Sequence, residues 1–180
     1  MKFSTRARYG LRMMVELARG LEKERVVRLG QIAAITNISQ NYLLQLTIPL
    51  KKRGVIRGIS GKNGGYQLAR PAGQIKLSEI IEAVDGFISL TGCVRSPDIC
   101  LNSSFCEARI IWVILSENMF DVLEKFSLRD LIEKQQLAKI REEYSYMSLL
   151  YPDQVIREKT LETASACPNM QLPKQKEKDR

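Results

Sequence analysis

Residues 39–50 read SQNYLLQLTIPL, and the interpretation of the neighbouring chain depends on this stretch. Ser39 is a suitable N-cap, because its hydroxyl can accept a hydrogen bond from an unpaired N–H in the first turn of a helix. Residues 29–36 also have helical spacing, and Asn37 with Ile38 supplies a turn between the two helices. Two short helices joined in this way predict a helix-turn-helix.

The helix predicted at 39–50 has an apolar face and a polar face. The apolar side chains that can pack in a core are Tyr42, Leu43, Leu46 and Leu50. The polar side chains left for the exposed face are Ser39, Gln40, Asn41 and Gln45. An amide can donate and accept hydrogen bonds at once and so can read adenine in a DNA groove; ordinary surface amides after an N-cap are the alternative. Pro49 lacks the N–H that would donate to Gln45, so a kink or a tightened turn is expected there.

A glycine-rich segment follows at 54–71 and reads GVIRGISGKNGGYQLARP. Gly54 is expected to stop the helix, and the β-like runs at 55–56 and 66–68 predict a two-stranded wing. Glycines let the backbone approach a sugar-phosphate chain. The wing side chains expected to contact DNA are Arg57, Ser60, Lys62 and Asn63. A nucleotide-binding phosphate loop is the competing interpretation, but neither the P-loop order nor the Rossmann order of residues is present.

The charge is distributed unevenly along the chain. Residues 1–70 contain 14 Lys and Arg against three acidic residues, Glu16, Glu22 and Glu24, a balance of +11. Of the totals of 28 basic and 20 acidic residues, 14 and 17 lie after residue 70, a balance of −3. A cationic first part is suited to neutralising phosphates, whereas a solvated basic surface is the alternative reading.

The composition excludes several classes of protein. The 180 residues contain no histidine, which excludes Ser-His-Asp and Cys-His catalysis as well as Cys/His zinc fingers. No constellation of substrate-binding residues is visible, so we do not expect an enzyme. The start of the chain is basic rather than apolar, and no apolar run approaches the length of a membrane span. A cytoplasmic protein without membrane contact is therefore expected.

Helices are also predicted at 5–21 and 77–84, and the second precedes a segment that we call the cysteine loop (91–106), TGCVRSPDICLNSSFC. Cys93, Cys100 and Cys106 can converge on one centre in such a loop, and three thiolates would hold most of an iron-sulfur cluster or a zinc ion. Buried or incidental thiols are the alternative, which the polar and turn-forming composition disfavours. Cys167 lies apart and is expected to be a solvent-exposed thiol.

A long helix is predicted from residue 107 to about residue 126. Apolar residues recur there at alternating steps of three and four, at Trp112, Leu115, Met119, Val122 and Phe126. Such a seam favours a partner helix, and a second copy of the chain is the economical partner; packing against the winged domain is the alternative. A last helix is predicted from Ser127 toward residue 146, capped with Asp130. We therefore expect a winged helix-turn-helix at 1–75, a cysteine loop with dimerisation helices at 76–150 and a flexible tail at 151–180.

Several of these stretches resemble the Rrf-two family of winged-helix transcriptional regulators. They are MKFSTRARYGLRMMVELA, SQNYLLQL, the wing ending in GGYQLARP, LSEIIEAVDG, and the three cysteines followed by EARIIWVILSENMFDVL. The resemblance covers about residues 1–145. It implies a mainly α fold with a small β wing, and a homodimeric repressor that binds a pseudo-palindromic double-stranded DNA operator. It also implies a 2Fe-2S or 4Fe-4S cluster on the loop cysteines, so that DNA affinity responds to iron-sulfur status, nitric oxide or redox state.

The chain departs from the family pattern at four positions. Arg109 stands where some members have a histidine that completes the cluster, and Arg8 stands where others take an aspartate from the second subunit. The fourth ligand therefore stays open among Asp98, Glu107, Glu16, Cys167, a small external molecule and no cluster at all. Leu44 replaces an acidic base-contacting residue of several members and Ser60 replaces a wing arginine, so the family's operator sequences do not transfer.

Two other functions are compatible with the same residues. A cluster-free member of the family would respond through its thiols, a metabolite or a partner protein. A small iron-sulfur redox protein is the more remote alternative, because no motif supplies acid-base chemistry.

Overall fold

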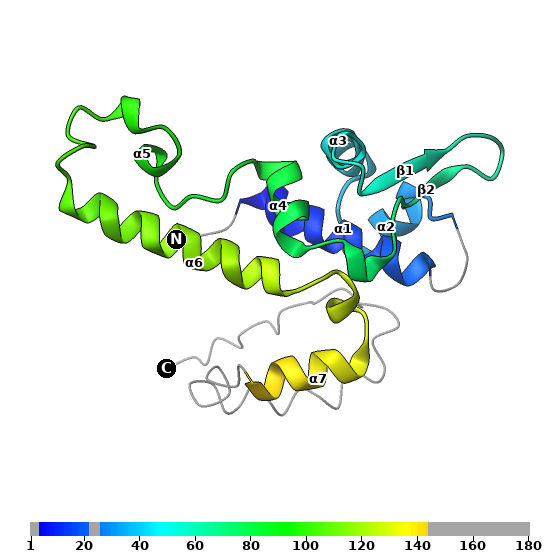
Figure 1. Ribbon diagram of the computed structural model, residues 1–180. Coiled ribbons are helices and arrows are strands. Elements are labelled where there is room, and N and C mark those ends of the chain that lie inside the picture. The colour runs from blue at the N-terminus through cyan, green and yellow to red at the C-terminus, as the bar shows by residue number, and fades with distance from the viewer. Residues whose placement is uncertain (1–3, 22–25, 144–180) are drawn as a thin grey trace, which may run out of the picture. The chain divides into compact units, whose positions relative to one another are not determined.

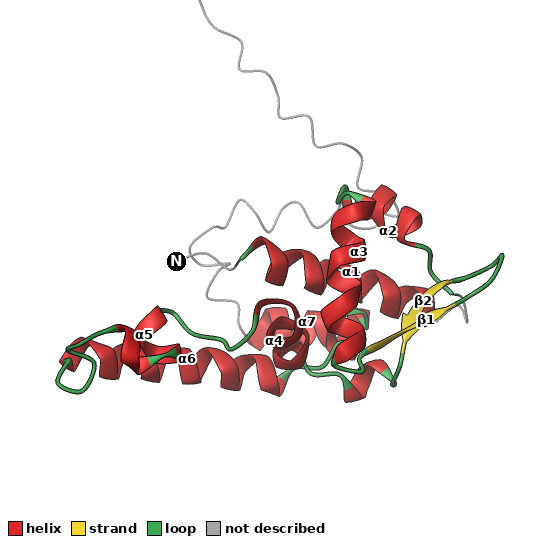
Figure 2. Ribbon diagram, turned by 90° about the horizontal axis from the view of Figure 1, so that it is seen from above, coloured by secondary structure: helices red, strands yellow, loops and turns green. Residues whose placement is uncertain are grey.

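The computed structural model describes residues 4–21 and 26–143. These residues form a mainly helical fold with one small antiparallel sheet, which confirms the fold class predicted from the sequence (Figures 1 and 2). The expectations for Cys167 and for the tail at 151–180 lie outside the described residues.

The first three helices form a common core. They are α1 (Thr5–Leu21), α2 (Leu29–Thr36) and α3 (Gln40–Lys52). Their buried apolar side chains include Met13, Met14, Leu17, Ile32, Leu43, Leu46 and Leu50. Asn37 has a left-handed φ of 55° and donates its N–H to the Ala33 carbonyl at 2.9 Å, which ends α2. The predicted cap is also present, because Ser39 Oγ accepts from the Tyr42 N–H at 3.3 Å. α3 continues through Pro49, so the proline does not end the helix.

The wing consists of β1 (Ile56–Ile59) and β2 (Gly65–Leu68), which pair antiparallel. Gly54 precedes them with a φ of 73°, a conformation that glycine adopts without strain. Val27 adds a bridge to the outer edge of β2, since its N–H and carbonyl exchange hydrogen bonds with Tyr66 at 2.9 and 2.8 Å. The start of α2 is thereby joined to the wing.

α4 (Leu77–Asp85) lies directly against α1, where Gly10 leaves room for Val84. The short 3-10 turn η1 (Ala72–Gln74) precedes α4. The cysteine loop contains two more short helical segments, α5 (Gly92–Arg95) and η2 (Pro97–Ile99). The long helix α6 (Glu107–Lys125) then packs on α4 through Met119, Phe120 and Leu123. The cysteine loop lies at the end of α6 that is distant from the wing (Figure 1).

The predicted last helix begins later than the sequence indicates. Ser127 does bond to the Asp130 carboxylate, at 2.7 Å from its N–H and 2.8 Å from its hydroxyl, but only a 3-10 turn follows, η3 (Arg129–Leu131). α7 starts at Lys134 and is described to Glu143. The expected start was wrong because the chain at Ser127 is held extended, by backbone hydrogen bonds from Leu77 to Phe126 and from Leu128 to Ile75.

Candidate DNA interface and cysteine loop

The exposed face of α3 carries the polar residues predicted to read DNA. Ser39, Gln40, Asn41 and Gln45 are all exposed, while Leu43, Leu46 and Leu50 fix the opposite face in the core. The Gln40 side chain lies beside α2, where its Oε1 would be 3.7 Å from a Cβ added at Gly30. The same face ends in Lys51 and Lys52, and two apolar residues lie within it, Leu44 and Ile48. The structure therefore brings the predicted α3 residues together on one free surface.

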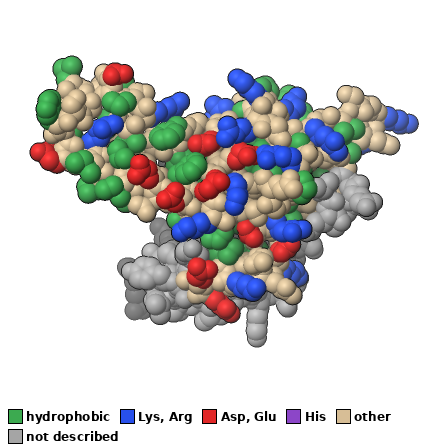
Figure 3. Space-filling model, in the orientation of Figure 1, with side chains coloured by type: hydrophobic (Ala, Val, Ile, Leu, Met, Phe, Trp, Pro, Cys, Tyr) green, Lys and Arg blue, Asp and Glu red, His purple; other side chains and the backbone are tan. Residues whose placement is uncertain are grey.

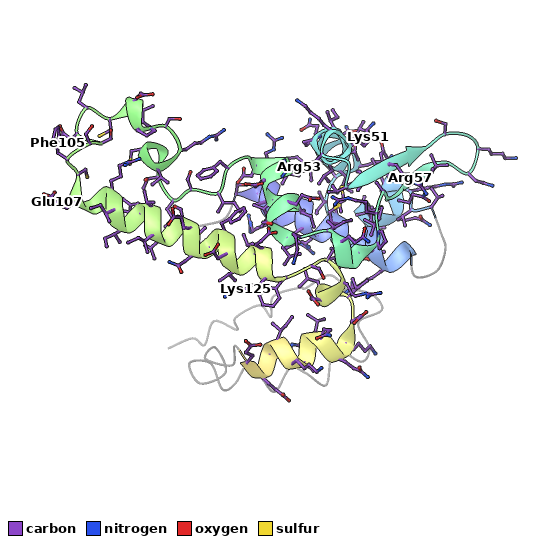
Figure 4. The ribbon with its side chains drawn as sticks, in the orientation of Figure 1. Lys51, Arg53, Arg57, Phe105, Glu107 and Lys125 are labelled. Atoms are coloured by element: carbon purple, nitrogen blue, oxygen red, sulfur yellow. The ribbon has the colours of Figure 1, made fainter. Side chains whose placement is uncertain are left out.

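The wing places its four predicted contact residues at the surface beside α3. Arg57, Ser60, Lys62 and Asn63 are exposed. Arg57 faces Gln67 across the two strands, and the amide oxygen of Gln67, in the orientation that satisfies both groups, accepts from Nε and Nη2 of Arg57 at 2.5 Å. Lys and Arg side chains gather over α3 and the wing, among them Lys51, Arg53 and Arg57 (Figures 3 and 4). Arg53 is partly neutralised, because its Nη2 lies 3.3 Å from a Glu82 carboxylate oxygen.

The tip of the wing is held by an arginine that sequence reasoning missed. Arg28 Nη2 donates to the Lys62 carbonyl at 3.1 Å and to Asn63 Oδ1 at 3.3 Å. Arg28 is 34 residues before Lys62 and also precedes the first turn of α2, so it links the helix-turn-helix to the wing tip. A basic residue at the start of a helix was the only sequence signal, and it gave no indication of this contact.

The cysteine loop and the residue directly before it, Leu90, are attached to α6 at two points. The Leu90 N–H donates to Ser116 Oγ at 3.1 Å, and buried Ser116 in turn donates to the Trp112 carbonyl at 2.7 Å. Nearer the loop, Arg109 Nε donates to the Cys93 carbonyl at 3.1 Å. The segment that carries Cys93 is therefore anchored to the first turns of α6. Arg109, which stands where some family members have a ligating histidine, makes one of these structural contacts.

The three loop cysteines differ in exposure. Cys100 is exposed, whereas Cys93 and Cys106 are half-buried, and Cys106 is the residue that precedes the first turn of α6. Thr91 Oγ1 lies 3.2 Å from Cys93 Sγ. Several apolar side chains of the loop face solvent, including Ile99, Leu101 and Phe105, which lies beyond the N-terminal end of α6 (Figure 4).

Thiolates are the donors that soft metal centres need, so the three cysteines fit an iron-sulfur cluster in ligand type. Within residues 4–21 and 26–143, however, no three Cys, Asp or Glu side chains are grouped so that they could hold a metal ion. Arg109 contributes no ligand atom, because a guanidinium only donates hydrogen bonds. The donor chemistry of the three cysteines fits such a centre, and their side chains are not grouped around one point in this structure.

The apolar seam predicted on α6 is divided between two surfaces. Met119 packs inside the chain against Ile81 and Ile88, and Phe126, just past the helix, packs on the main core. Trp112 is half-buried, whereas Leu115 and Val122 remain exposed. The open apolar stripe of α6 comprises Ile110, Ile111, Ile114, Leu115 and Val122. Figure 3 shows hydrophobic side chains over the cysteine loop and the adjoining part of α6, interspersed with charged ones.

The comparison with protein families gives a match over most of the chain. The profile of the Rrf2 family, described as iron-dependent transcriptional regulators, matches residues 3–134. The chain belongs to the Rrf2 family. This membership confirms the resemblance seen in the sequence and makes the protein an Rrf2-type transcriptional regulator.

Individual Rrf2 relatives are similar to the chain over most of their length. The HTH-type transcriptional regulator IscR of Xenorhabdus nematophila is 32% identical over 140 residues, which are 78% of this chain and 84% of the relative. Protein rrf2 of Nitratidesulfovibrio vulgaris is 34% identical over 138 residues, 77% of this chain and 91% of the relative. The name of IscR describes a transcriptional regulator.

Solved structures of Rrf2 regulators have a similar fold. CymR, the global cysteine regulator of B. subtilis, superposes with a TM-score of 0.61 at 34% identity, over 73% of this chain and 96% of CymR. IscR of T. potens gives a TM-score of 0.62 at 29% identity, over 77% of this chain and 90% of that structure.

In the described ranges of the present chain, no helix is both long enough and apolar enough to cross a bilayer.

Proposed function

We propose that this Rrf2 protein is a dimeric repressor that binds a specific double-stranded DNA operator, with α3 in the major groove and the wing on the phosphate backbone. The observation that carries the proposal is the exposed face of α3, where Gln40, Asn41 and Gln45 are free while basic residues follow at its end. Base contacts supply specificity and phosphate contacts supply affinity and position. In this assignment Arg57, Ser60, Lys62 and Asn63 contact the backbone or the adjacent groove.

The assignment predicts that two groups of variants behave differently. Gln40→Ala and Asn41→Ala should weaken operator binding by about 1–3 kcal/mol and random-DNA binding much less, because each removes a base contact. Lys62→Ala should weaken both and lower the slope of log K against log salt by about 1. The measurement is fluorescence anisotropy with an operator selected from random duplexes.

Two surface variants serve as matched controls for these substitutions. Gln135→Ala and Lys139→Ala remove an exposed glutamine and an exposed lysine from α7, and both should leave DNA binding unchanged. Equal losses on operator and random DNA for Gln40→Ala would mean that α3 does not read bases.

The cysteine loop is the proposed sensor, with Cys93, Cys100 and Cys106 holding a 2Fe-2S or 4Fe-4S cluster. Such a cluster, when bound, supplies a centre that reacts to iron supply, oxidants and nitric oxide. Arg109 anchors the loop to α6 and Ser116 anchors the preceding residue, Leu90, so a rearrangement of the loop can alter α6 and the relative placement of two paired protomers. An absorption spectrum with iron and sulfide analysis of anaerobically purified protein is the test. Colourless protein without iron would contradict the cluster and leave the DNA-binding proposal standing.

The arrangement of the loop also favours a second candidate, a regulator that responds directly through its thiols. Its basis is that the three loop cysteines are free thiols and that Cys100 is exposed to solvent. Replacing the three cysteines by serine separates the candidates when combined with metal analysis. Metal-free wild-type protein whose operator affinity still changes on oxidation would favour the thiol sensor.

A further inference from the structure

Two aliphatic side chains occupy the middle of the DNA-facing surface proposed for α3. Leu44 is 48% exposed and Ile48 is 64% exposed. They are four residues apart in the helix and therefore lie one above the other on the same face. Gln40 continues the row at one end and Lys52 at the other, with exposed Asn41, Gln45 and Lys51 alongside. The centre of a surface rich in polar and basic groups is thus apolar.

The core of the protein does not require these two side chains. α3 is held by buried Leu43, Leu46 and Leu50 on its opposite side. Leu44 and Ile48 remain about half or more exposed beside each other, so a partner that covered them would remove apolar surface from water. The surroundings indicate which partner this is, because a basic helix end and a basic wing are complementary to a polyanion.

We infer that Leu44 and Ile48 recognise thymine through apolar contact with its 5-methyl group in the major groove. This inference rests on the proposed function. The methyl group of thymine is the apolar group that a base pair presents in that groove. A G·C pair at the same position would place donors and acceptors against a hydrocarbon and leave them unpaired. Leu44 and Ile48 therefore select thymine and also disfavour G·C pairs.

The helix geometry limits where these thymines lie in the operator. Four residues of an α-helix rise by about 6 Å, and successive base pairs are about 3.4 Å apart. The two side chains can therefore reach methyl groups on either strand within about two base-pair steps of each other. Each half-site should contain one or two such thymines, beside the bases read by Gln40 and Asn41.

The experiment removes single methyl groups from the DNA. An operator is first selected from random duplexes with the full-length protein, and each thymine is then replaced by deoxyuridine, which keeps the pairing and lacks only the methyl. We expect wild-type affinity to fall about fourfold for each contacted methyl, since about 0.8 kcal/mol is lost at about 1.4 kcal/mol per tenfold. Substitution in both half-sites should reduce it by about tenfold or more.

Variants assign the effect to particular side chains. With Leu44→Ala and Ile48→Ala, the difference between thymine and deoxyuridine should disappear at the position that each residue contacts. Ile35→Ala is the matched control, because it truncates an isoleucine of similar exposure, 49%, on α2, and it should keep the wild-type dependence. The wild-type measurements need no variant, so they hold even where a substitution impairs folding.

Three outcomes would overturn the inference. If wild type prefers the operator over random DNA but every deoxyuridine duplex binds with equal affinity, the methyl contact is wrong and the proposed function stands. If the methyl dependence persists in the Leu44→Ala, Ile48→Ala double variant, other residues read the thymines. If selection yields no preferred sequence, the proposed function fails and the inference fails with it.

Discussion

At the scale of single residues, the wing depends on glycines at which a side chain would collide with backbone. A Cβ on Gly64 would lie 2.4 Å from the Ile59 carbonyl oxygen and 2.9 Å from that of Gly61. The sequence suggested that these glycines serve close approach to a sugar-phosphate chain. The structure adds a reason internal to the fold, because the hairpin turn closes through a hydrogen bond from the Gly64 N–H to the Gly61 carbonyl at 2.9 Å.

Gly64→Ala should therefore destabilise the protein by about 1–3 kcal/mol, since the turn must open to relieve the collision. Thermal or urea unfolding measures the change. Gly58→Ala is the matched control, because its Cβ would make only an ordinary 3.8 Å contact with the Tyr66 ring and should change stability little. An unfolding midpoint for Gly64→Ala equal to that of the wild type would show that the turn accommodates a methyl group.

At the scale of elements, the sequence predicted what depends on local chemistry. The helix-turn-helix followed from Ser39, Asn37 and the apolar spacing, and α1 and α6 followed from their periodicity. Contacts between distant segments could not be predicted from spacing. Val27 joins the wing by two hydrogen bonds to Tyr66, too short a pairing to leave a strand pattern in the sequence.

The candidate site also combines features that the sequence predicts with contacts that it does not predict. The exposed amides of α3 and the basic wing were predictable, because polar residues opposite an apolar stripe face solvent. The seam on α6 was only partly predictable, because the first half of that helix is apolar nearly all round. Periodicity could not separate Met119, which packs against Ile81 and Ile88, from Leu115, which stays open.

The hydrogen bonds from Arg28 to the wing tip predict how the mobility of the wing depends on this arginine. Arg28→Ala removes the two hydrogen bonds to Lys62 and Asn63 and should increase motion of the wing tip. Because those bonds are exposed, stability should change by less than about 1 kcal/mol. Amide hydrogen exchange at Gly64 should accelerate, while Arg19→Ala, which removes an exposed arginine paired with Glu16, should leave it unchanged. Unaltered exchange at Gly64 in Arg28→Ala would show that Arg28 does not hold the tip.

At the scale of the whole molecule, the proposed dimer depends on the open apolar stripe of α6. Ile114→Glu places a charge on that stripe, at a side chain that is 45% exposed in the single chain. A second copy would have to bury this charge, so the dimer should dissociate at least tenfold more readily in sedimentation equilibrium. Ile35→Glu, the same change at an isoleucine of similar exposure on α2, should leave the dimer intact. Equal dissociation constants for wild type and Ile114→Glu would exclude this stripe as the interface.

The proposed function joins two regions of one protein, a DNA-reading surface on α3 with the wing and a cysteine loop at the distant end of α6 (Figure 1). The measurement that tests this connection most directly is operator affinity under anaerobic and oxidising conditions, for the wild type and for the Cys93→Ser, Cys100→Ser, Cys106→Ser variant. We predict that wild-type affinity changes at least fivefold between the two conditions, whereas the triple variant has one affinity in both. A wild-type affinity that is the same in both conditions would contradict control of DNA binding by the cysteine loop.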